Sequence, residues 1–248
     1  MASPDTDAIF FPITGDDGST HYLVGIYYLA ATHDPAPFAL LLHGIPGSQQ
    51  NHDLAMRLRD SGWHVLVLYF SGCWGSGGDY NATTQVRDAR AALDYVLSEA
   101  APRPVDPDRI AVLGYSLGGR PALLSAAEDA RVQAVISVSG FADLSEVLLE
   151  TSFFEGITPL LHGSTVEKLA EQWRQMGAGI QPYEAIAQIA PRPVLVIHGA
   201  ADEAVPAYNA DALSGAHVMQ VRIEGANHGF TDHRAEFMEA AHTFLKKL

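Results

Sequence analysis

One serine of this chain lies in a setting that could make it a nucleophile. Ser116 is the centre of Gly114-Tyr-Ser-Leu-Gly118, which matches the pattern G-x-S-x-G. In that pattern a sharp turn between a strand and a helix lifts the serine hydroxyl above a sheet. Such a turn leaves no room for β-carbons two residues before and after the serine, which explains the need for Gly114 and Gly118. The chemistry predicted is attack by Ser116 on a carbonyl carbon.

A serine hydroxyl needs a base, and the base needs an orienting acid. Asp202 and His228 each follow a predicted strand, and the chain order Ser116, Asp202, His228 is the one expected of a fold with the G-x-S-x-G turn. Asp143 is the alternative acid, since it follows the strand after the serine. The chain has 11 histidines. Two of them, at positions 43 and 198, precede glycines at strand ends and are expected to hold loops by hydrogen bonds.

Acyl transfer also needs donors for the negatively charged oxygen of the intermediate. The backbone N–H of Leu117 is one predicted donor, because it begins a helix whose dipole favours negative charge. The second is the N–H of Ile45 in His43-Gly-Ile-Pro-Gly47, where Pro46 has no N–H to offer. A plain glycine turn is the alternative interpretation of this loop.

Aromatic side chains near these loops are candidates for the substrate pocket, which we assign to Trp74, Tyr115, Phe153 and Phe154. Trp74 lies in a glycine-rich loop, Ser71–Gly78, that lacks the residues of a nucleotide-binding loop. Cys73 in this loop is expected to be a small buried apolar side chain. No His, Cys or Asp cluster has metal-ligand spacing, so we expect neither a metal nor another cofactor.

The elements that must position these residues alternate between strand and helix, which predicts an α/β fold with a mostly parallel, doubly wound sheet. A hairpin around Gly15–Gly18 and a turn at His33–Pro37 precede the first buried strand. Strands are expected at 9–12, 22–29, 38–42, 65–70, 110–113, 132–139, 193–197 and 218–223. Helices are expected at 49–61, 84–100, 117–129 and 234–247.

The stretch 141–190 does not fit this alternation, because about fifty residues separate two strands. It is rich in apolar side chains, among them Leu148, Phe153 and Trp173. We therefore expect residues 1–248 to form one domain in which about 141–190 is a small helical cap over the site. An ordinary crossover helix with additional loops is the alternative.

Composition narrows the class of protein further. The chain of 248 residues carries a formal net charge of −14, which argues against nucleic acid and strongly anionic substrates as partners. Hydrophobic residues make up 48% and charged residues 18%, as suits a buried central sheet. A single cysteine, no recognisable signal peptide and no apolar run long enough for a bilayer predict a cytoplasmic protein without a membrane span. The sequence is compatible with a homo-oligomer.

Four motifs together resemble the α/β-hydrolase superfamily, from about Phe38 to the C-terminus. HGIPGS, GYSLGG, HGAAD and NHGF are similar to those of carboxylesterases, of feruloyl esterases and of the catalytic domain of prolyl-oligopeptidase-type peptidases. This resemblance implies an eight-stranded sheet, an acyl-enzyme mechanism and a short cap insertion. Arg120 and Pro121 depart from the pattern after the second glycine, and the sequence assigns neither a role.

The function predicted is that of a serine carboxylesterase acting on small-molecule esters with short to medium acyl or aryl groups. A serine peptidase or amidase is the first alternative, although only about 37 residues precede the first core strand and none can be assigned to a substrate-screening domain. The second is a non-catalytic binding protein on the same scaffold. A lyase or perhydrolase that uses the same three residues also fits the sequence.

Overall fold

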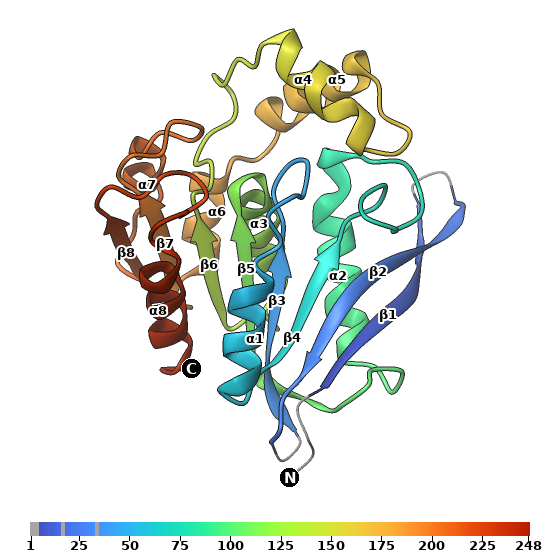
Figure 1. Cartoon of the computed structure of the whole chain (residues 1–248), viewed down its shortest axis with the longest axis vertical. Coiled ribbons are helices and arrows are strands. Elements are labelled where there is room, and N and C mark those ends of the chain that lie inside the picture. The colour runs from blue at the N-terminus through green and yellow to red at the C-terminus, as the bar shows by residue number, and fades with distance from the viewer. Residues whose placement is uncertain (1–4, 16–17, 33–34) are drawn as a thin grey trace.

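The computed structural model describes residues 5–15, 18–32 and 35–248, and its centre is one eight-stranded sheet. The strand order is β1-β2-β4-β3-β5-β6-β7-β8 (Figure 1). The strands are β1 (Asp5–Thr14), β2 (Thr20–Leu29), β3 (Ala36–Leu42), β4 (His64–Tyr69), β5 (Val105–Tyr115), β6 (Ala134–Val138), β7 (Val194–Gly199) and β8 (Val218–Ile223). The predicted fold class is confirmed.

The direction of the strands brings the loops that carry the predicted catalytic residues to one edge of the sheet. β1 and β2 form an antiparallel hairpin, and β2 pairs with β4 in the antiparallel sense. Every other pair, from β4-β3 to β7-β8, is parallel. The carboxyl ends of the parallel strands therefore meet at the same edge of the sheet, where loops carry functional groups in such folds. Asp16, Asp17, His33 and Asp34, which belong to the two predicted turns, lie outside the described residues.

Helices cover both faces of the sheet. Helices α1 and α8 pack on one face, and α2, α3 and α6 pack on the other. Their bounds are α1 (His52–Asp60), α2 (Gln85–Val96), α3 (Gly119–Glu128), α6 (Pro182–Ile189) and α8 (Arg234–Leu245). A short helix α7 (Tyr208–Ala212) follows β7, where the sequence predicts only a loop. In the described part of the chain no helix combines the length and the apolarity that crossing a membrane requires.

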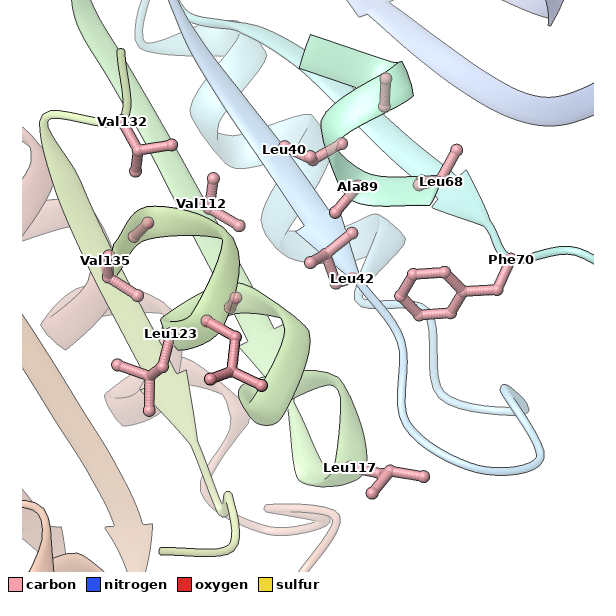
Figure 2. Packing of buried hydrophobic residues seen from close by; sticks show 14 of the residues in the cluster. Leu40, Leu42, Leu68, Phe70, Ala89, Val112, Leu117, Leu123, Val132 and Val135 are labelled. Atoms are coloured by element: carbon pink, nitrogen blue, oxygen red, sulfur yellow. The ribbon is translucent and has the colours of Figure 1, made fainter. Parts of the chain in front are cut away.

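Buried aliphatic side chains fill the space between the sheet and the helices. Figure 2 shows Leu40, Leu42, Val112 and Val135 of the strands beneath Ala89 of α2 and Leu123 of α3. The residues of β3, β4 and β6 are buried throughout, as expected for strands covered on both faces. This packing holds the strand ends, and the loops that follow them, in fixed positions.

Three helical segments fill the long stretch between β6 and β7 before α6 begins. They are α4 (Thr151–Ile157), the short 3₁₀ helix η3 (Thr158–Leu160) and α5 (Val166–Ala178). α4 and α5 lie beyond the carboxyl edge of the sheet (Figure 1). Phe141, just after β6, packs edge-on against Trp173 of α5 with ring centroids 5.8 Å apart.

Candidate active site

The turn that carries Ser116 is as tight as its glycines suggest. β5 ends at Tyr115, the 3₁₀ helix η2 (Ser116–Gly118) follows, and Ser116 has a positive φ of 54°. A β-carbon on Gly114 would overlap the carbonyl of Gly118, and one on Gly118 would lie 2.5 Å from the carbonyl oxygen of His43. The steric prediction for both glycines is confirmed. The strained serine is held by backbone on two sides.

Asp202 and His228 are hydrogen-bonded to each other. Asp202 follows β7 and His228 follows β8, and Nδ1 of the imidazole lies 2.8 Å from Oδ2 of the carboxylate. Oδ1 accepts hydrogen bonds from the N–H groups of Ala204, at 3.0 Å, and Val205, at 2.9 Å. The carboxylate is thus fixed by its own loop, and it leaves Nε2 of His228 as the nitrogen free to accept a proton.

The environment of Asp202 keeps it ionised. Burial favours the neutral carboxyl, but hydrogen bonds from His198, His228 and the Val205 N–H outweigh burial and lower the pKa of Asp202 well below its usual value. His198 contributes through Nε2, which lies 3.4 Å from Oδ2. A fixed negative charge behind His228 is what an imidazole needs to become protonated during a reaction.

Ser116 and His228 are linked through Tyr115 rather than by a direct hydrogen bond. Both residues are described, and no hydrogen bond of 3.5 Å or less joins their side chains. The hydroxyl of Tyr115, the residue before the serine, donates to the His228 carbonyl at 2.8 Å, and the two ring centroids are 5.3 Å apart. The serine–histidine contact is often long in ligand-free sites and shortens when substrate binds.

The loop after β3 lies against the serine turn. A β-carbon on Gly44 would be 2.8 Å from the β-carbon of Ser116, so only glycine permits this approach. The next N–H, that of Ile45, has no hydrogen-bond acceptor in the described part of the chain. The N–H of Leu117 belongs to the first turn of η2. The loop that carries the Ile45 N–H and the turn that carries the Leu117 N–H are therefore in contact at Gly44 and Ser116.

His43 and His198 hold loops, as expected. His43 Nδ1 donates to the carbonyl of Gly44 at 2.7 Å, and its Nε2 accepts from the N–H of Phe70 at 3.3 Å. Burial lowers the pKa of His43 to about 4 although the bond to Gly44 opposes the shift, so the ring is neutral. His198 Nε2 donates to the Val205 carbonyl at 2.8 Å.

The four residues assigned to the substrate pocket lie in different settings. Trp74 is 46% exposed, and its indole N–H donates to the Pro46 carbonyl, next to the Ile45 loop. Phe153 is partly exposed on α4, whereas Phe154 is buried and lines a cavity of about 400 Å³ beside α5. Tyr115 is buried and its hydroxyl is bonded to the histidine loop, and its place on the pocket wall stays a prediction.

Asp143, the alternative acid, is not bonded to the histidine. Its carboxylate accepts a hydrogen bond from the N–H of Ser145 at 2.8 Å, and no bond to His228 occurs among the described residues. The structure therefore brings His228 together with Asp202 and leaves Asp143 to its own turn.

Gln49 supports the site although the sequence predicts no such role. Its amide donates to the Gly229 carbonyl and accepts from the Tyr115 hydroxyl, which ties the histidine loop to β5. The only sequence signal for it is a polar residue just after the HGIPGS motif.

The single thiol of the chain is buried and protonated. Burial raises the pKa of Cys73 to about 12, so it behaves as the small apolar side chain that the sequence predicts. Among the residues that the structure describes, no group of three or more His, Cys, Asp or Glu side chains could hold a metal ion.

Comparison with known proteins places these features in a family. The sequence profile of the Prolyl oligopeptidase family matches residues 74–248. The 2,6-dihydropseudooxynicotine hydrolase of Paenarthrobacter nicotinovorans is 35% identical over 127 residues, which cover 51% of this chain and 31% of that protein. LipM of Mycobacterium tuberculosis, named a probable carboxylic ester hydrolase, is 28% identical over 217 residues, or 79% of this chain and 48% of LipM.

A solved structure agrees over nearly the whole chain. The structure of Est1E from Butyrivibrio proteoclasticus, with ferulic acid bound, superposes with a TM-score of 0.77 at 21% identity and covers 96% of this chain and 98% of Est1E. At that identity the likeness shows the fold alone. The curated relatives are longer proteins, and this chain spans between 31% and 62% of their length.

Proposed function

Since the chain belongs to the prolyl oligopeptidase family of α/β hydrolases, we propose that it is a serine hydrolase that cleaves carboxylic esters through an acyl-enzyme intermediate. Ser116 attacks the ester carbonyl, and His228 accepts its proton and returns it to the leaving alcohol. Asp202 holds the imidazole in the required tautomer. The N–H groups of Leu117 and Ile45 stabilise the negatively charged oxygen.

One observation supports this proposal most strongly. The Asp202–His228 bond of 2.8 Å forms next to Tyr115, which precedes a serine held at a positive φ, although the three residues follow three different strands. A binding protein on this scaffold has no need of a carboxylate kept ionised behind a histidine. The close approach of the Gly44 loop to Ser116 supports the proposal that the Ile45 N–H is an oxyanion donor.

An ester is preferred to a peptide as substrate for two reasons. α4 and α5 lie over the carboxyl edge of the sheet and bring apolar side chains such as Phe153 and Phe154, which suit an acyl or aryl group. LipM is named for ester hydrolysis, and Est1E was solved with ferulic acid. The family's name keeps a peptidase as the second candidate, which a comparison of ester and amide substrates decides.

The first experiment measures hydrolysis of p-nitrophenyl butyrate by the wild type and by Ser116→Ala. We expect kcat to fall by about 10⁴-fold or more in Ser116→Ala. Ser125→Ala is the matched control, because Ser125 lies on the following helix and, among the described residues, its hydroxyl bonds only to the Ala122 carbonyl. A loss below about a hundredfold in Ser116→Ala would show that another group is the nucleophile.

A fluorophosphonate probe tests the same residue without a chosen substrate. Covalent labelling of the wild type and loss of labelling in Ser116→Ala are expected. An intact wild-type protein that stays unlabelled, and that hydrolyses no ester of a panel of acyl lengths, would favour the binding protein.

A further inference from the structure

Arg120 is a buried cation that the proposed mechanism does not use. It follows Ser116 by four residues, in the first turn of α3, and is only 8% exposed. Its Nε and Nη1 atoms are fully buried, and no hydrogen bond or ion pair of this guanidinium occurs in the described part of the chain. Burial lowers the pKa of Arg120, but a guanidinium does not lose its proton in proteins.

The carboxylates of the described chain leave Arg120 unpaired. Glu128 is the acid whose charge acts on Arg120, and it lies eight residues further along α3, about 12 Å along the helix axis. Glu128 is itself paired with Arg90, with 2.5 Å between the ion-pair atoms. No described side chain of this protein therefore neutralises the buried charge, although an unpaired buried ion is costly.

The backbone carbonyls near Arg120 also accept hydrogen bonds from another residue. Nη2 lies beside Gly179, after the end of α5, where unsatisfied carbonyls of the helix could have accepted hydrogen bonds from it. The side-chain amide of Gln181 occupies these acceptors instead. It donates to the carbonyls of Met176, Gly177 and Gly179 at 2.8 to 3.0 Å. A purely structural role as a cap of α5 is thus already filled by Gln181.

Arg120 lies at the end of α3 that adjoins the Ser116 turn. Side chains of a helix tilt toward its N-terminus, which for α3 is the Ser116 turn. Arg120 comes four residues after Ser116, and the 3₁₀ turn η2 lies between the serine and the start of α3. Its guanidinium lies beside Gly179, in the short segment between α5 and α6.

We propose that Arg120 is a carboxylate-binding residue of the active site, and that the preferred substrate is an ester whose acyl group carries a free carboxylate a few carbons from the ester carbonyl. This inference rests on the proposed function. A planar guanidinium binds a carboxylate through two parallel hydrogen bonds, and the bond is stronger when water is excluded. The negative surface does not oppose one such group, because salt screens distant surface charges whereas the contact with Arg120 is local.

The test compares p-nitrophenyl hydrogen adipate, whose acyl chain ends in a carboxylate, with p-nitrophenyl hexanoate, a neutral ester of the same length. We expect the wild type to have the higher kcat/KM on the adipate ester. Arg120→Met should lower kcat/KM on the adipate ester about tenfold to a hundredfold more than on the hexanoate. Arg120→Lys should restore part of the difference, because it keeps the charge but loses the paired geometry.

Arg174→Met is the matched control. Arg174 lies on α5 with a largely exposed side chain paired with Glu171, and its loss should leave the ratio of the two rates unchanged. Equal kcat/KM values of the wild type on the two esters would overturn the carboxylate subsite but not the proposed esterase activity. An equal loss on both esters in Arg120→Met would also overturn it, and would assign Arg120 to stabilisation of the oxyanion or of the fold.

Binding distinguishes a failure of the subsite from a failure of the esterase. Adipate should raise the melting temperature of the wild type, and Arg120→Met should abolish this rise. Such a result supports the subsite even if no ester is hydrolysed. If adipate and the shorter and longer dicarboxylates leave the melting temperature of the wild type unchanged, the subsite is overturned. Without ligand, Arg120→Met should melt no lower than the wild type, since it removes an unpaired buried charge.

Discussion

Asp202 combines burial with four hydrogen-bond contacts on two oxygen atoms. Oδ1 is occupied by two backbone N–H groups, so the carboxylate cannot rotate away from His228. Oδ2 receives His228 at 2.8 Å and lies 3.4 Å from His198. At the scale of single residues, this carboxylate decides which nitrogen of His228 carries the proton.

Asp202→Asn tests this assignment. An amide nitrogen in place of Oδ2 cannot accept the Nδ1 proton of His228, so the imidazole is held in the wrong tautomer. We expect kcat on p-nitrophenyl butyrate to fall by about 10³ to 10⁴-fold, with a small change in KM. Asp143→Asn is the control, since within the part of the chain that the structure describes the Asp143 carboxylate bonds only to the Ser145 N–H. If Asp143→Asn were inactive and Asp202→Asn active, Asp143 rather than Asp202 would be the acid that orients His228.

His43 predicts a pH dependence of stability. Burial lowers its folded pKa to about 4, whereas an unfolded histidine titrates near 6.5. Between these values the unfolded chain binds more protons than the folded chain, so the free energy of unfolding rises with pH. Its contribution is lost as the pH falls from 6.5 toward 4, by up to about 3 kcal/mol.

Urea unfolding of the wild type and His43→Gln at several pH values between about 4.5 and 7 measures this contribution. Gln can keep an acceptor for the Phe70 N–H but cannot titrate, so its stability should depend less steeply on pH. His162→Gln, at an exposed position, should keep the wild-type slope. Parallel slopes for the wild type and His43→Gln would show that His43 is not held neutral.

At the scale of elements, the contact between the β3 loop and η2 sets the geometry of the site. Gly44→Ala would place a β-carbon 2.8 Å from Cβ of Ser116 and 3.0 Å from the Tyr115 carbonyl oxygen. The loop must then move away, and the Ile45 N–H moves with it. We expect kcat to fall by about 10² to 10³-fold, as for the loss of one oxyanion donor.

Gly156→Ala is the matched control for Gly44→Ala. A β-carbon at Gly156, in α4, would meet no atom within 4 Å. It should leave kcat unchanged and raise stability by up to about 1 kcal/mol, because alanine favours the helix. Full activity in Gly44→Ala would show that the loop contributes no donor.

The positions of the elements also explain which features of the site the sequence predicts and which it misses. Ser116, Asp202 and His228 could be proposed from the sequence because each follows a predicted strand, and the carboxyl ends of parallel strands meet at one edge whatever the intervening chain does. The predicted start of α1 lies three residues early because Asn51 adopts a left-handed conformation with a φ of 57°, which the apolar periodicity does not report. Gln49 acts through neighbours that are distant in sequence, and no local pattern reveals such contacts.

At the scale of the whole molecule, the segment over the site is joined to the main core. Phe154, Leu169 and Trp173 belong to the same cluster of buried side chains as Leu117 and Phe70. Backbone bonds of 2.9 Å also link His162 to Gly72 and to Tyr80. Gln172 adds two bonds, from the Ala82 N–H and to the Tyr80 carbonyl.

These links predict that α4 and α5 unfold together with the sheet rather than as a separate lid. The chain has three tryptophans, and Trp63→Phe with Trp74→Phe leaves Trp173 on α5 as the reporter. Its fluorescence should change at the same urea concentration as the far-UV circular dichroism of the whole chain.

Gln172→Met sharpens the test, because it leaves the Ala82 N–H and the Tyr80 carbonyl without partners in a buried place. In a chain that unfolds as one unit, this change lowers both midpoints equally, since the lost bonds stabilise the whole molecule. In a chain with an independent lid, only the Trp173 midpoint falls, and the fluorescence change precedes the loss of helix signal. If the two midpoints already differ in the protein that carries only the two tryptophan substitutions, α4 and α5 do not share one cooperative core with the sheet. Opening of α4 and α5 could then admit substrate.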